Sequence, residues 1–274
     1  KRRWIWTPIS FQGNPSQKHL LKLILKDVSL ESPQENILLD EVLLHLAEEK
    51  SGKEVLRFWE SKILFVVLGR ISELEEDVHK EWALRNNIPV IRRLSGGGTV
   101  LQGPGCLNFS LVLSKDRLPV IGDLHRSYRF ILGEVARALS LLHVKTIFHP
   151  PSDLALAGNQ RKISGNAQHR AKRHILHHGT LLYQFDSNLM EKVLKFPQKV
   201  PEYRQNRGHR DFVTNIPVQV SDIKRAFKTV FQIEEEQSAL TTSESLYLKE
   251  FLEKKHITID LQFQKFCLTN YFFL

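Results

Sequence analysis

The stretch Arg92-Arg93-Leu94-Ser95-Gly96-Gly97-Gly98 decides how this chain is interpreted. It follows the apolar run Ile88-Pro89-Val90-Ile91, which is typical of a short strand. Three consecutive glycines are costly in a helix or strand, because glycine loses the most backbone freedom on folding and adds no side chain to a core. We therefore expect a loop where backbone approaches a bound molecule closely or adopts positive φ.

A second stretch, Lys162-Ile163-Ser164-Gly165, places a lysine beside another bare patch of backbone. Together the two stretches predict a pocket for an elongated, partly anionic small molecule. Plainer interpretations stay open: the glycines would also suit a tight turn, and a lone lysine in a basic protein is usually a solvated surface charge.

The composition is that of a globular protein, with 274 residues, 42% of them hydrophobic and 25% charged. This length allows one large domain, or one domain with a small appendage. The cysteines are Cys106 and Cys267, which favours a reducing, cytoplasmic compartment over a disulfide framework. No apolar run reaches the length of a membrane span. Pro8 and the polar residues 10–19 leave no room for the apolar core of a signal peptide.

The formal charge of +9 indicates an acidic partner. Nucleic acid is the usual first candidate, but the basic residues are scattered and form no stripe along one helix. An acidic protein or a phosphorylated small molecule suits the charge equally well, so a nucleic-acid-binding module is the third choice.

Periodicity predicts a mixed α/β or α+β fold, with helices packed on a sheet. The boundary between a main domain, residues 1–232, and a short C-terminal helical extension, residues 233–274, is expected in the polar segment 232–242. Helices are expected at residues 34–49, 73–86, 124–142, 220–231 and 243–254. Strands are expected at residues 3–9, 63–68, 88–91, 107–113, 145–148, 153–157, 161–167 and 175–185.

Several motifs share an order along the chain: the glycine stretch, Gly105-x-Leu107-Asn108, Asp153-Leu154, the lysine stretch extended to Ala167-Gln168, and His178-Gly179-Thr180. In this order the chain resembles the lipoate–protein ligase A family of the biotin/lipoate ligase superfamily, from about Glu35 to about Asn215. The resemblance implies a mixed, mostly antiparallel sheet of the class II biotin/lipoyl ligase type. It also implies a two-step reaction. Lipoate and ATP, with Mg²⁺, give lipoyl-AMP, and the lipoyl group then passes to a lysine of a carrier domain.

The resemblance assigns roles to individual residues. Lys162 matches the catalytic lysine, whose ammonium would stabilise negative charge in the transition state. Asp153 would be a magnesium ligand. Residues expected to bind lipoate or lipoyl-AMP are Arg93, Ser95, Gly96, Gly97, Gly98, Asn108, Ser164, Gly165, Ala167, His178 and Gly179. Arg93 among them would pair with a carboxylate or phosphate.

Two departures keep alternatives open. Gln102-Gly103-Pro104 stands where many ligases carry His-Asp, which admits a non-catalytic acyl-binding homologue. An octanoyl- or lipoyl-transferase of the same fold needs a nucleophilic cysteine, and the matching position holds Ile147. Cys106 is the remaining candidate nucleophile near the glycines, although a small buried hydrophobe is the preferred interpretation.

The expected partners are lipoyl carrier domains, either acidic E2 domains or the glycine-cleavage H protein. Two basic groups are predicted to form their docking face: Lys172 and Arg173, and a second group of Arg204, Arg207 and Arg210. A histidine metal site is not expected, because His177 and His178 are adjacent and point to opposite faces of a strand.

Overall fold

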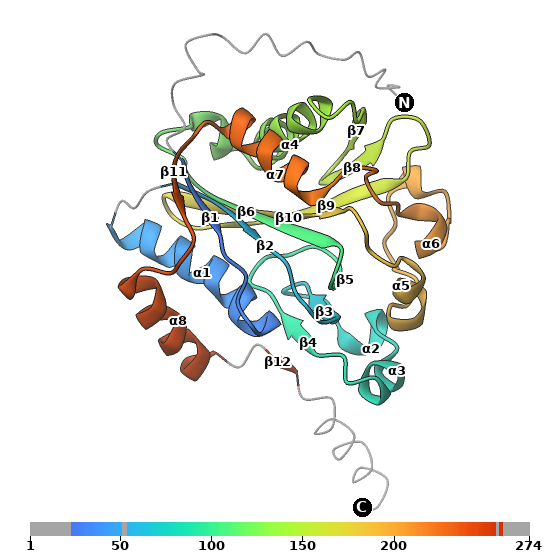
Figure 1. The fold of residues 1–274 in the computed structure, drawn as a ribbon. Helices are drawn as coiled ribbons and strands as arrows, with labels where there is room; N and C mark the ends of the chain where they lie inside the picture. Colours follow the sequence, from blue (N-terminus) through green and yellow to red (C-terminus); the bar gives the residue numbers. More distant parts are fainter. Residues whose placement is uncertain (1–22, 51–53, 256–257, 260–274) are drawn as a thin grey trace, which may run out of the picture.

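The protein is described by a computed structural model that covers residues 23–50, 54–255 and 258–259. An eight-stranded sheet crosses the molecule in the order β11-β1-β2-β6-β10-β9-β8-β7 (Figure 1). Strand β1 is parallel to β11 and β2, and the other five neighbouring pairs are antiparallel. The expected mixed, mostly antiparallel sheet is confirmed. Its strands are β1 (Leu23–Asp27), β2 (Glu54–Trp59), β6 (Cys106–Ser114), β7 (Thr146–His149), β8 (Asp153–Leu156), β9 (Lys162–Arg170), β10 (His174–Leu182) and β11 (Ile233–Gln237).

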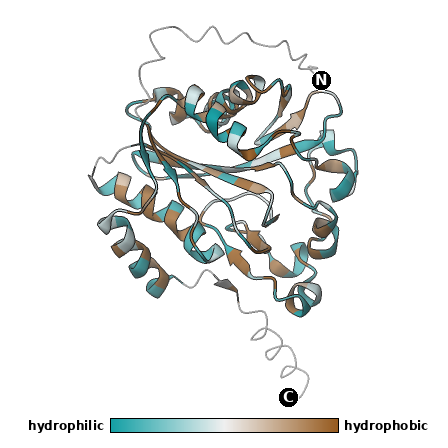
Figure 2. Cartoon of the chain, viewed as in Figure 1, coloured by the Kyte–Doolittle hydropathy of each residue, from teal (hydrophilic) through white to brown (hydrophobic). Residues whose placement is uncertain are grey.

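Helices cover both faces of this sheet. On one face lie α4 (Leu124–Ser140) and α7 (Val220–Phe231), with their apolar sides turned to the sheet (Figure 2). On the other lie α1 (Pro33–Lys50), α8 (Thr242–Lys254) and a smaller sheet. Successive side chains of β6 point to opposite faces of the sheet. Phe109 and Leu111 enter the core beneath α4 and α7, whereas Ser110 points to α1. The α1 face is therefore where polar side chains gather.

The smaller sheet has the order β12-β4-β3-β5, made of β3 (Phe65–Leu68), β4 (Val90–Arg92), β5 (Val100–Gln102) and β12 (Thr258–Ile259). Before β4, the single helix expected at residues 73–86 is wrong: the chain forms α2 (Leu74–Asp77) and α3 (Lys80–Arg85). The break has a tertiary cause. Val78 is extended and pairs with Leu194, and the backbone N–H of His79 donates to the Val193 carbonyl at 2.8 Å.

Helix α1 also differs from the amphipathic helix that the sequence predicts. Every residue from Asn36 to Leu44 is buried, because the large sheet, α8 and the smaller sheet all pack on it. Asp40 is 2% exposed. A charged side chain in such a place needs a partner, since an isolated buried charge is very costly.

The segment after residue 232 continues the main architecture. Strand β11 pairs with β1, and α8 packs against α1. A buried ion pair joins Lys26 of β1 to Glu244 of α8 at 2.8 Å. The division into a catalytic domain and an extension stays a prediction, but these contacts make the segment part of the large sheet and its covering layer.

Most other expected elements have counterparts, and helix α7 has the expected bounds. Strands β1, β2, β5, β11 and β12 were not predicted. Strand β11 reads Ile-Glu-Glu-Glu-Gln, because it lies at the sheet edge, where charged residues are common. The strand expected at residues 3–9 and the polar residues 10–19 lie outside the described residues. Within the described part of the chain, no helix combines the length and apolarity that a membrane span requires.

Candidate functional site

A cavity of about 1240 Å³ lies on the α1 face of the large sheet. Its lining runs from β2 and β6 across β10 and β9 to β8. We call its two ends the β2 end (Ile37, Asp40, Trp59, Gln102 and Ser110) and the β8 end (His149, Asp153, Lys162 and Tyr203). The predicted site residues that line it are Arg93, Gly97, Gly98, Asn108, Asp153, Lys162, Ser164, Gly165, Ala167, His178 and Gly179. Ser95 and Gly96 are not among the lining residues.

At the β8 end, Lys162 is held by a chain of polar contacts. Its Nζ lies 2.8 Å from Asp153 Oδ1, and the Tyr203 hydroxyl donates to Asp153 Oδ2 at 2.8 Å. The Tyr203 ring stacks on His149 with centroids 3.7 Å apart. Burial, with Asp153 beside it, raises the pKa of Tyr203 well above its ordinary value, so the hydroxyl stays a donor. The lysine ammonium is thus fixed and faces the cavity.

The glycine of the lysine motif has a steric reason. A Cβ on Gly165 would lie 2.9 Å from Lys162 Nζ. Gly165 stands opposite Asp153 in the ladder, and Ile163 is the extra residue of a bulge between β8 and β9. The lysine side chain therefore crosses the bare backbone of Gly165 to reach Asp153, which explains why these residues occur together.

The glycine loop lines the same cavity as the lysine motif and lies close to the end of that motif at Ala167. Gly97 has φ +87°, and a Cβ there would lie 3.9 Å from Ala167 Cβ. Arg93 lies behind this loop: its Nη2 donates to the carbonyls of Gly96 and Gly98 at 2.7 and 2.8 Å. Burial lowers the pKa of Arg93 to about 10, which still leaves it charged at neutral pH. Arg93 thus shapes the loop, and the pairing with a ligand anion that the resemblance implies for it stays a prediction.

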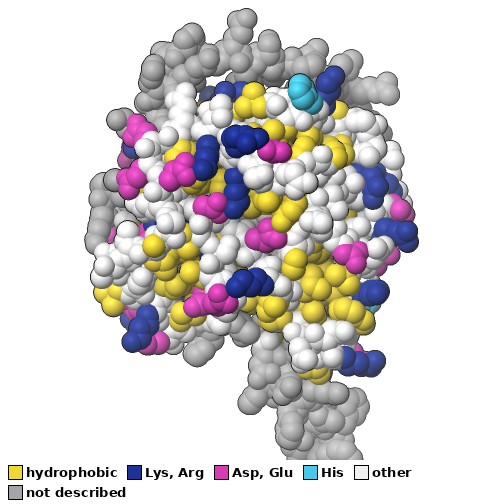
Figure 3. All heavy atoms as spheres, in the orientation of Figure 1, with side chains coloured by type: hydrophobic (Ala, Val, Ile, Leu, Met, Phe, Trp, Pro, Cys, Tyr) yellow, Lys and Arg dark blue, Asp and Glu magenta, His cyan; other side chains and the backbone are white. Residues whose placement is uncertain are grey.

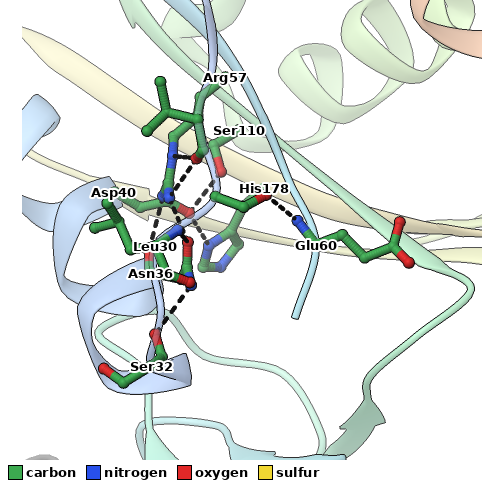
Figure 4. A network of polar contacts seen from close by, with 10 residues as sticks. Leu30, Ser32, Asn36, Asp40, Arg57, Glu60, Ser110 and His178 are labelled. Atoms are coloured by element: carbon green, nitrogen blue, oxygen red, sulfur yellow. Dashed lines mark hydrogen bonds and ion pairs between the residues drawn. The ribbon is translucent and has the colours of Figure 1, made fainter. Parts of the chain in front are cut away.

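A buried polar network forms the β2 end (Figure 4). Arg57 Nη1 donates to Asp40 Oδ1 at 2.7 Å, and Ser110 Oγ donates to Asp40 Oδ2 at 2.5 Å. His178 follows: its Nδ1 lies 3.8 Å from Asp40 Oδ2, and its Nε2 lies 2.6 Å from Ser95 Oγ. Burial acts to raise the pKa of Asp40, but Arg57, His178 and Ser110 outweigh burial and hold it below its ordinary value.

This network reaches the glycine loop, because Arg93 Nε donates to Ser95 Oγ at 3.0 Å. Ser95 is 1% exposed. It therefore serves as a link between His178 and Arg93, instead of the direct ligand contact that the sequence predicts for it. Asp40 on α1 and Arg57 on β2 are thus connected to the glycine loop through His178, Ser95 and Arg93.

The adjacent histidines point to opposite faces, as expected. His177 packs against Phe109 and Tyr128 on the α4 side, and burial lowers its pKa to about 3, so it is neutral. His178 lines the cavity. The opposite directions exclude a shared metal ion.

Neither candidate position for a cysteine nucleophile suits that role. Cys106 is 1% exposed and is not among the residues that line the cavity. Burial raises its pKa to about 12, which disfavours the reactive thiolate. Ile147 pairs with Ala155 in the β7–β8 ladder and carries no thiol. Cys267 lies outside the described residues.

The predicted magnesium ligand does not fit the geometry of the site. Both oxygens of Asp153 already bond to Lys162 and Tyr203. Within residues 23–50, 54–255 and 258–259, no group of three His, Cys, Asp or Glu side chains is arranged to hold a metal ion. The described residues therefore form no metal centre of their own.

The basic residues predicted to form a docking face lie in two separate places, and their role in docking stays a prediction. Lys172 and Arg173 form the turn between β9 and β10, whereas Arg207 donates to the carbonyl of Gln160 near the start of β9. Nine residues of β9 separate the two places, roughly 25–30 Å at about 3.3 Å per residue. Arg204 is 4% exposed and lies over the rings of Phe196 and Phe212. On the face in Figure 3, Lys and Arg alternate with Asp and Glu.

Sequence reasoning gave no role to Asp40, Arg57, Ser110 and Tyr203. A signal was present for two of them. Asp40 stands among the apolar residues of the expected helix, and Arg57 interrupts the apolar run Val55-Leu56-Arg57-Phe58-Trp59. A charge inside an apolar run indicates a buried, partnered group.

Comparisons with known proteins agree with the geometry of the site. The chain is 30% identical over 195 residues to the lipoate-protein ligase LplJ of Bacillus subtilis, covering 71% of this chain and 56% of that protein. It is 24% identical over 264 residues to the octanoyltransferase LipM of Halalkalibacterium halodurans, covering 85% of this chain and 95% of that protein. The chain thus spans about half the length of LplJ and nearly all of LipM.

A solved structure has the same fold. A chain from a structural analysis of a bi-partite lipoate protein ligase and its E2 lipoyl domain from Thermoplasma acidophilum matches with a TM-score of 0.74 at 24% identity, over 86% of this chain and 93% of that one. The family model of the lipoyl protein ligase A/B catalytic domain matches residues 32–235. This range includes both ends of the cavity and the glycine and lysine motifs, and the protein belongs to the lipoyl protein ligase A/B catalytic-domain family.

Proposed function

We propose that this protein is a lipoate–protein ligase, which activates lipoate with ATP and transfers the lipoyl group to a lysine of a carrier domain. One observation carries the proposal. The Lys162 ammonium, fixed by Asp153 at 2.8 Å, lines a cavity that extends across five strands of the large sheet and is also lined by Gly97 and Gly98 of the glycine loop. Such a cavity suits a long, thin acid with its anionic end beside the lysine.

In the first step, a lipoate carboxylate oxygen attacks the α-phosphorus of ATP and pyrophosphate leaves. Lys162 is the catalytic residue, because a compact ammonium stabilises the charge that gathers on the phosphate oxygens. The loop supplies room at Gly98, which lines the cavity: a Cβ there would meet no atom within 4 Å. Protein packing therefore does not require glycine at this position, which supports a ligand lying over the loop.

In the second step, the amine of the carrier lysine attacks the acyl carbon, AMP leaves, and the nitrogen loses a proton to solvent. Ser164, Gly165, Ala167, Asn108, His178 and Gly179 would line the bound acyl-adenylate. Arg93 and Ser95 act as positioning residues behind the loop. Mg²⁺ enters only as the ion that accompanies ATP, and no step is derived through it.

The proposed partners are acidic E2 lipoyl domains or the glycine-cleavage H protein, and the proposed compartment is the cytoplasm. The mouth of the cavity, meaning the exposed part of its lining, carries both signs of charge, because Lys199 lies there with Glu73, Glu76 and Glu202. The formal charge of +9 supports an acidic partner. We nominate Lys199 and the exposed Arg210, which follows the lining residue His209, as the basic residues that meet it.

The test is to incubate the protein with ATP, Mg²⁺, lipoate and an apo lipoyl domain, and to measure the intact mass of the domain. We expect a gain of one lipoyl group, lost when ATP is omitted or when Lys162→Ala replaces the wild type. No modification in the complete mixture contradicts the ligase proposal.

An acyltransferase of the same fold is the second candidate, favoured by the match to nearly the whole length of LipM. Replacing ATP and lipoate by an octanoyl thioester of a carrier protein separates the two candidates. Transfer from the thioester without ATP identifies a transferase. Activity in neither mixture, with retained binding of free lipoate, identifies a non-catalytic acyl-binding homologue.

A further inference from the structure

The Tyr203 hydroxyl is the second partner of the carboxylate that holds Lys162. Asp153 Oδ1 lies 2.8 Å from Lys162 Nζ, and Asp153 Oδ2 accepts from the Tyr203 hydroxyl at 2.8 Å. Each oxygen of the carboxylate therefore serves one donor. Tyr203 lies 50 residues from Asp153 along the chain, so this contact depends on the fold and not on a local motif.

Ring packing fixes the direction of this hydroxyl. The Tyr203 ring is almost parallel to the His149 ring, with an angle of 5° and centroids 3.7 Å apart, and the Phe212 ring lies 5.1 Å away. Burial, together with the charge of Asp153, raises the pKa of Tyr203 well above its ordinary value, so the phenol is neutral. The hydroxyl is therefore a fixed donor aimed at Asp153.

The turn that carries Tyr203 is tied to the start of β9, where Lys162 lies. Arg207 Nη2 donates to the carbonyl of Tyr203 at 2.7 Å and to the carbonyl of Gln160 at 3.2 Å. The Lys162 carbonyl accepts from the backbone N–H of Thr214 at 2.9 Å. These bonds hold the backbone of the turn against β9 without using the Tyr203 hydroxyl, so its removal should leave the turn in place.

The shared carboxylate limits how Lys162 is held. An ammonium has three donors, and a carboxylate has two acceptor oxygens. Because Tyr203 occupies Oδ2, Asp153 offers the ammonium a single oxygen, and the remaining donors can meet anionic groups of a bound substrate. Without the phenol hydroxyl, Asp153 would be free to turn both oxygens to Lys162 and to draw the ammonium away from the cavity.

We propose that Tyr203 is a positioning residue of the ligase reaction, which holds Asp153 so that Lys162 keeps donors free for the charged oxygens of the substrate. The proposal rests on the proposed function and deepens it by one residue. Tyr203 acts through Asp153, since its hydroxyl donates to the carboxylate and not to the substrate.

The first experiment measures acyl-adenylate formation by Tyr203→Phe, with pyrophosphate release as the rate and thermal melting to verify folding. Phenylalanine keeps the ring and removes only the hydroxyl. We expect kcat to fall about tenfold, at the low end of the effect of a hydrogen bond to a charged group, while the KM values for lipoate and ATP change by less than about threefold. A folded variant with the kcat of the wild type would overturn the proposal.

Tyr183→Phe is the matched control. The Tyr183 hydroxyl also donates to a carboxylate, that of Glu60, at 3.0 and 2.9 Å to its two oxygens, but neither residue lines the cavity. This variant should leave kcat and KM unchanged. Equal losses of kcat in both variants would reveal a general cost of removing a phenol hydroxyl and would contradict a specific role for Tyr203.

A double-mutant cycle tests whether Tyr203 acts through Asp153. Asp153→Ala removes the acceptor of the hydroxyl. Adding Tyr203→Phe to Asp153→Ala should then change kcat by less than about twofold, because no carboxylate remains to be held. A further loss as large as that in the wild-type background would mean that Tyr203 works independently of Asp153, against the proposal.

A spectroscopic measurement is independent of turnover. In protein with isotope-labelled lysine, the NMR signal of the Lys162 ammonium is identified by its absence in Lys162→Ala. We expect Tyr203→Phe to shift this signal and Tyr183→Phe to leave it in place. An unshifted signal in folded Tyr203→Phe would overturn the positioning role. A wild type that forms no acyl-adenylate, with a shifted signal in Tyr203→Phe, would contradict the proposed function and still support the hold of Tyr203 on Lys162.

Discussion

The ion pairs at the two ends of the cavity differ in how far their side chains are exposed. At the β2 end, Asp40 and Arg57 pair where their side chains are 3% and 0% exposed. At the β8 end, Asp153 and Lys162 pair where their side chains are 12% and 25% exposed. The first pair is enclosed and fixes the loop from behind, whereas the second faces the cavity and can meet a ligand. We therefore expect the first pair to serve chiefly stability and, under the proposed function, the second to serve chiefly chemistry.

Breaking the enclosed pair should produce the largest effect. Asp40→Asn leaves Arg57 as an uncompensated buried charge, and we expect a loss of about 3–5 kcal/mol in the free energy of unfolding at pH 7. Urea unfolding measures it. The matched control is Glu81→Gln, which breaks an exposed pair with Arg85 and should cost less than about 1 kcal/mol. Similar losses in both variants would contradict the comparison.

The pH dependence of the same variant sharpens the test. The pKa of Asp40 is lowered in the folded protein, because its charged partners outweigh burial. Its stabilisation is therefore present above the unfolded pKa of about 3.9 and is lost as pH falls through the lowered folded pKa. The stability gap between the wild type and Asp40→Asn should be constant above about pH 5 and should narrow below about pH 4.

Removing the exposed lysine should affect the rate more than the fold. Lys162→Ala should slow acyl-adenylate formation by on the order of a hundredfold or more, comparable to the loss of an oxyanion donor. Lys162→Arg should also fail, because a planar guanidinium does not reproduce the compact charge of an ammonium. Pyrophosphate release measures the rate, and thermal melting shows whether folding persists. Near-normal turnover in folded Lys162→Ala would contradict the mechanism.

The sequence predicted the residues of one cavity end better than those of the other. The reason is the sequence separation between the residues that interact at each end. Lys162, Ser164 and Gly165 act within one short stretch, so a local motif reveals them. Asp40 bonds to Arg57 and Ser110 across sequence separations of 17 and 70 residues, and no local pattern links such residues. Periodicity predicted the main helices and a mixed α/β or α+β fold, whereas the mostly antiparallel sheet was implied by the family resemblance. Strand β11 was not predicted, because its charged edge has no apolar alternation.

Reversing charges on the surface beside the cavity should have a smaller effect than replacing Lys162. Lys199→Glu with Arg210→Glu reverses charge at the mouth near the β8 end, and the apparent KM for the carrier domain should rise by up to about tenfold and become less sensitive to salt. The control, Lys172→Glu with Arg173→Glu, makes the same change at the far turn of the β9–β10 hairpin and should have little effect. Equal effects of both pairs would indicate long-range attraction instead of docking at the mouth.

The smallest effect is expected at Cys106, which lies at the β2 side of the molecule but outside the cavity lining. Serine keeps the size and the hydrogen-bonding ability of the thiol, so Cys106→Ser should retain turnover within about threefold and lose at most about 1–2 kcal/mol of stability. Intact mass should detect no acyl adduct on the wild-type enzyme during turnover, since a thiol whose pKa is near 12 yields almost no thiolate at neutral pH. A trapped acyl thioester on Cys106 would reverse the comparison, because the chemistry would then lie in the enclosed part of the protein, and the chain would act as a cysteine-dependent acyltransferase.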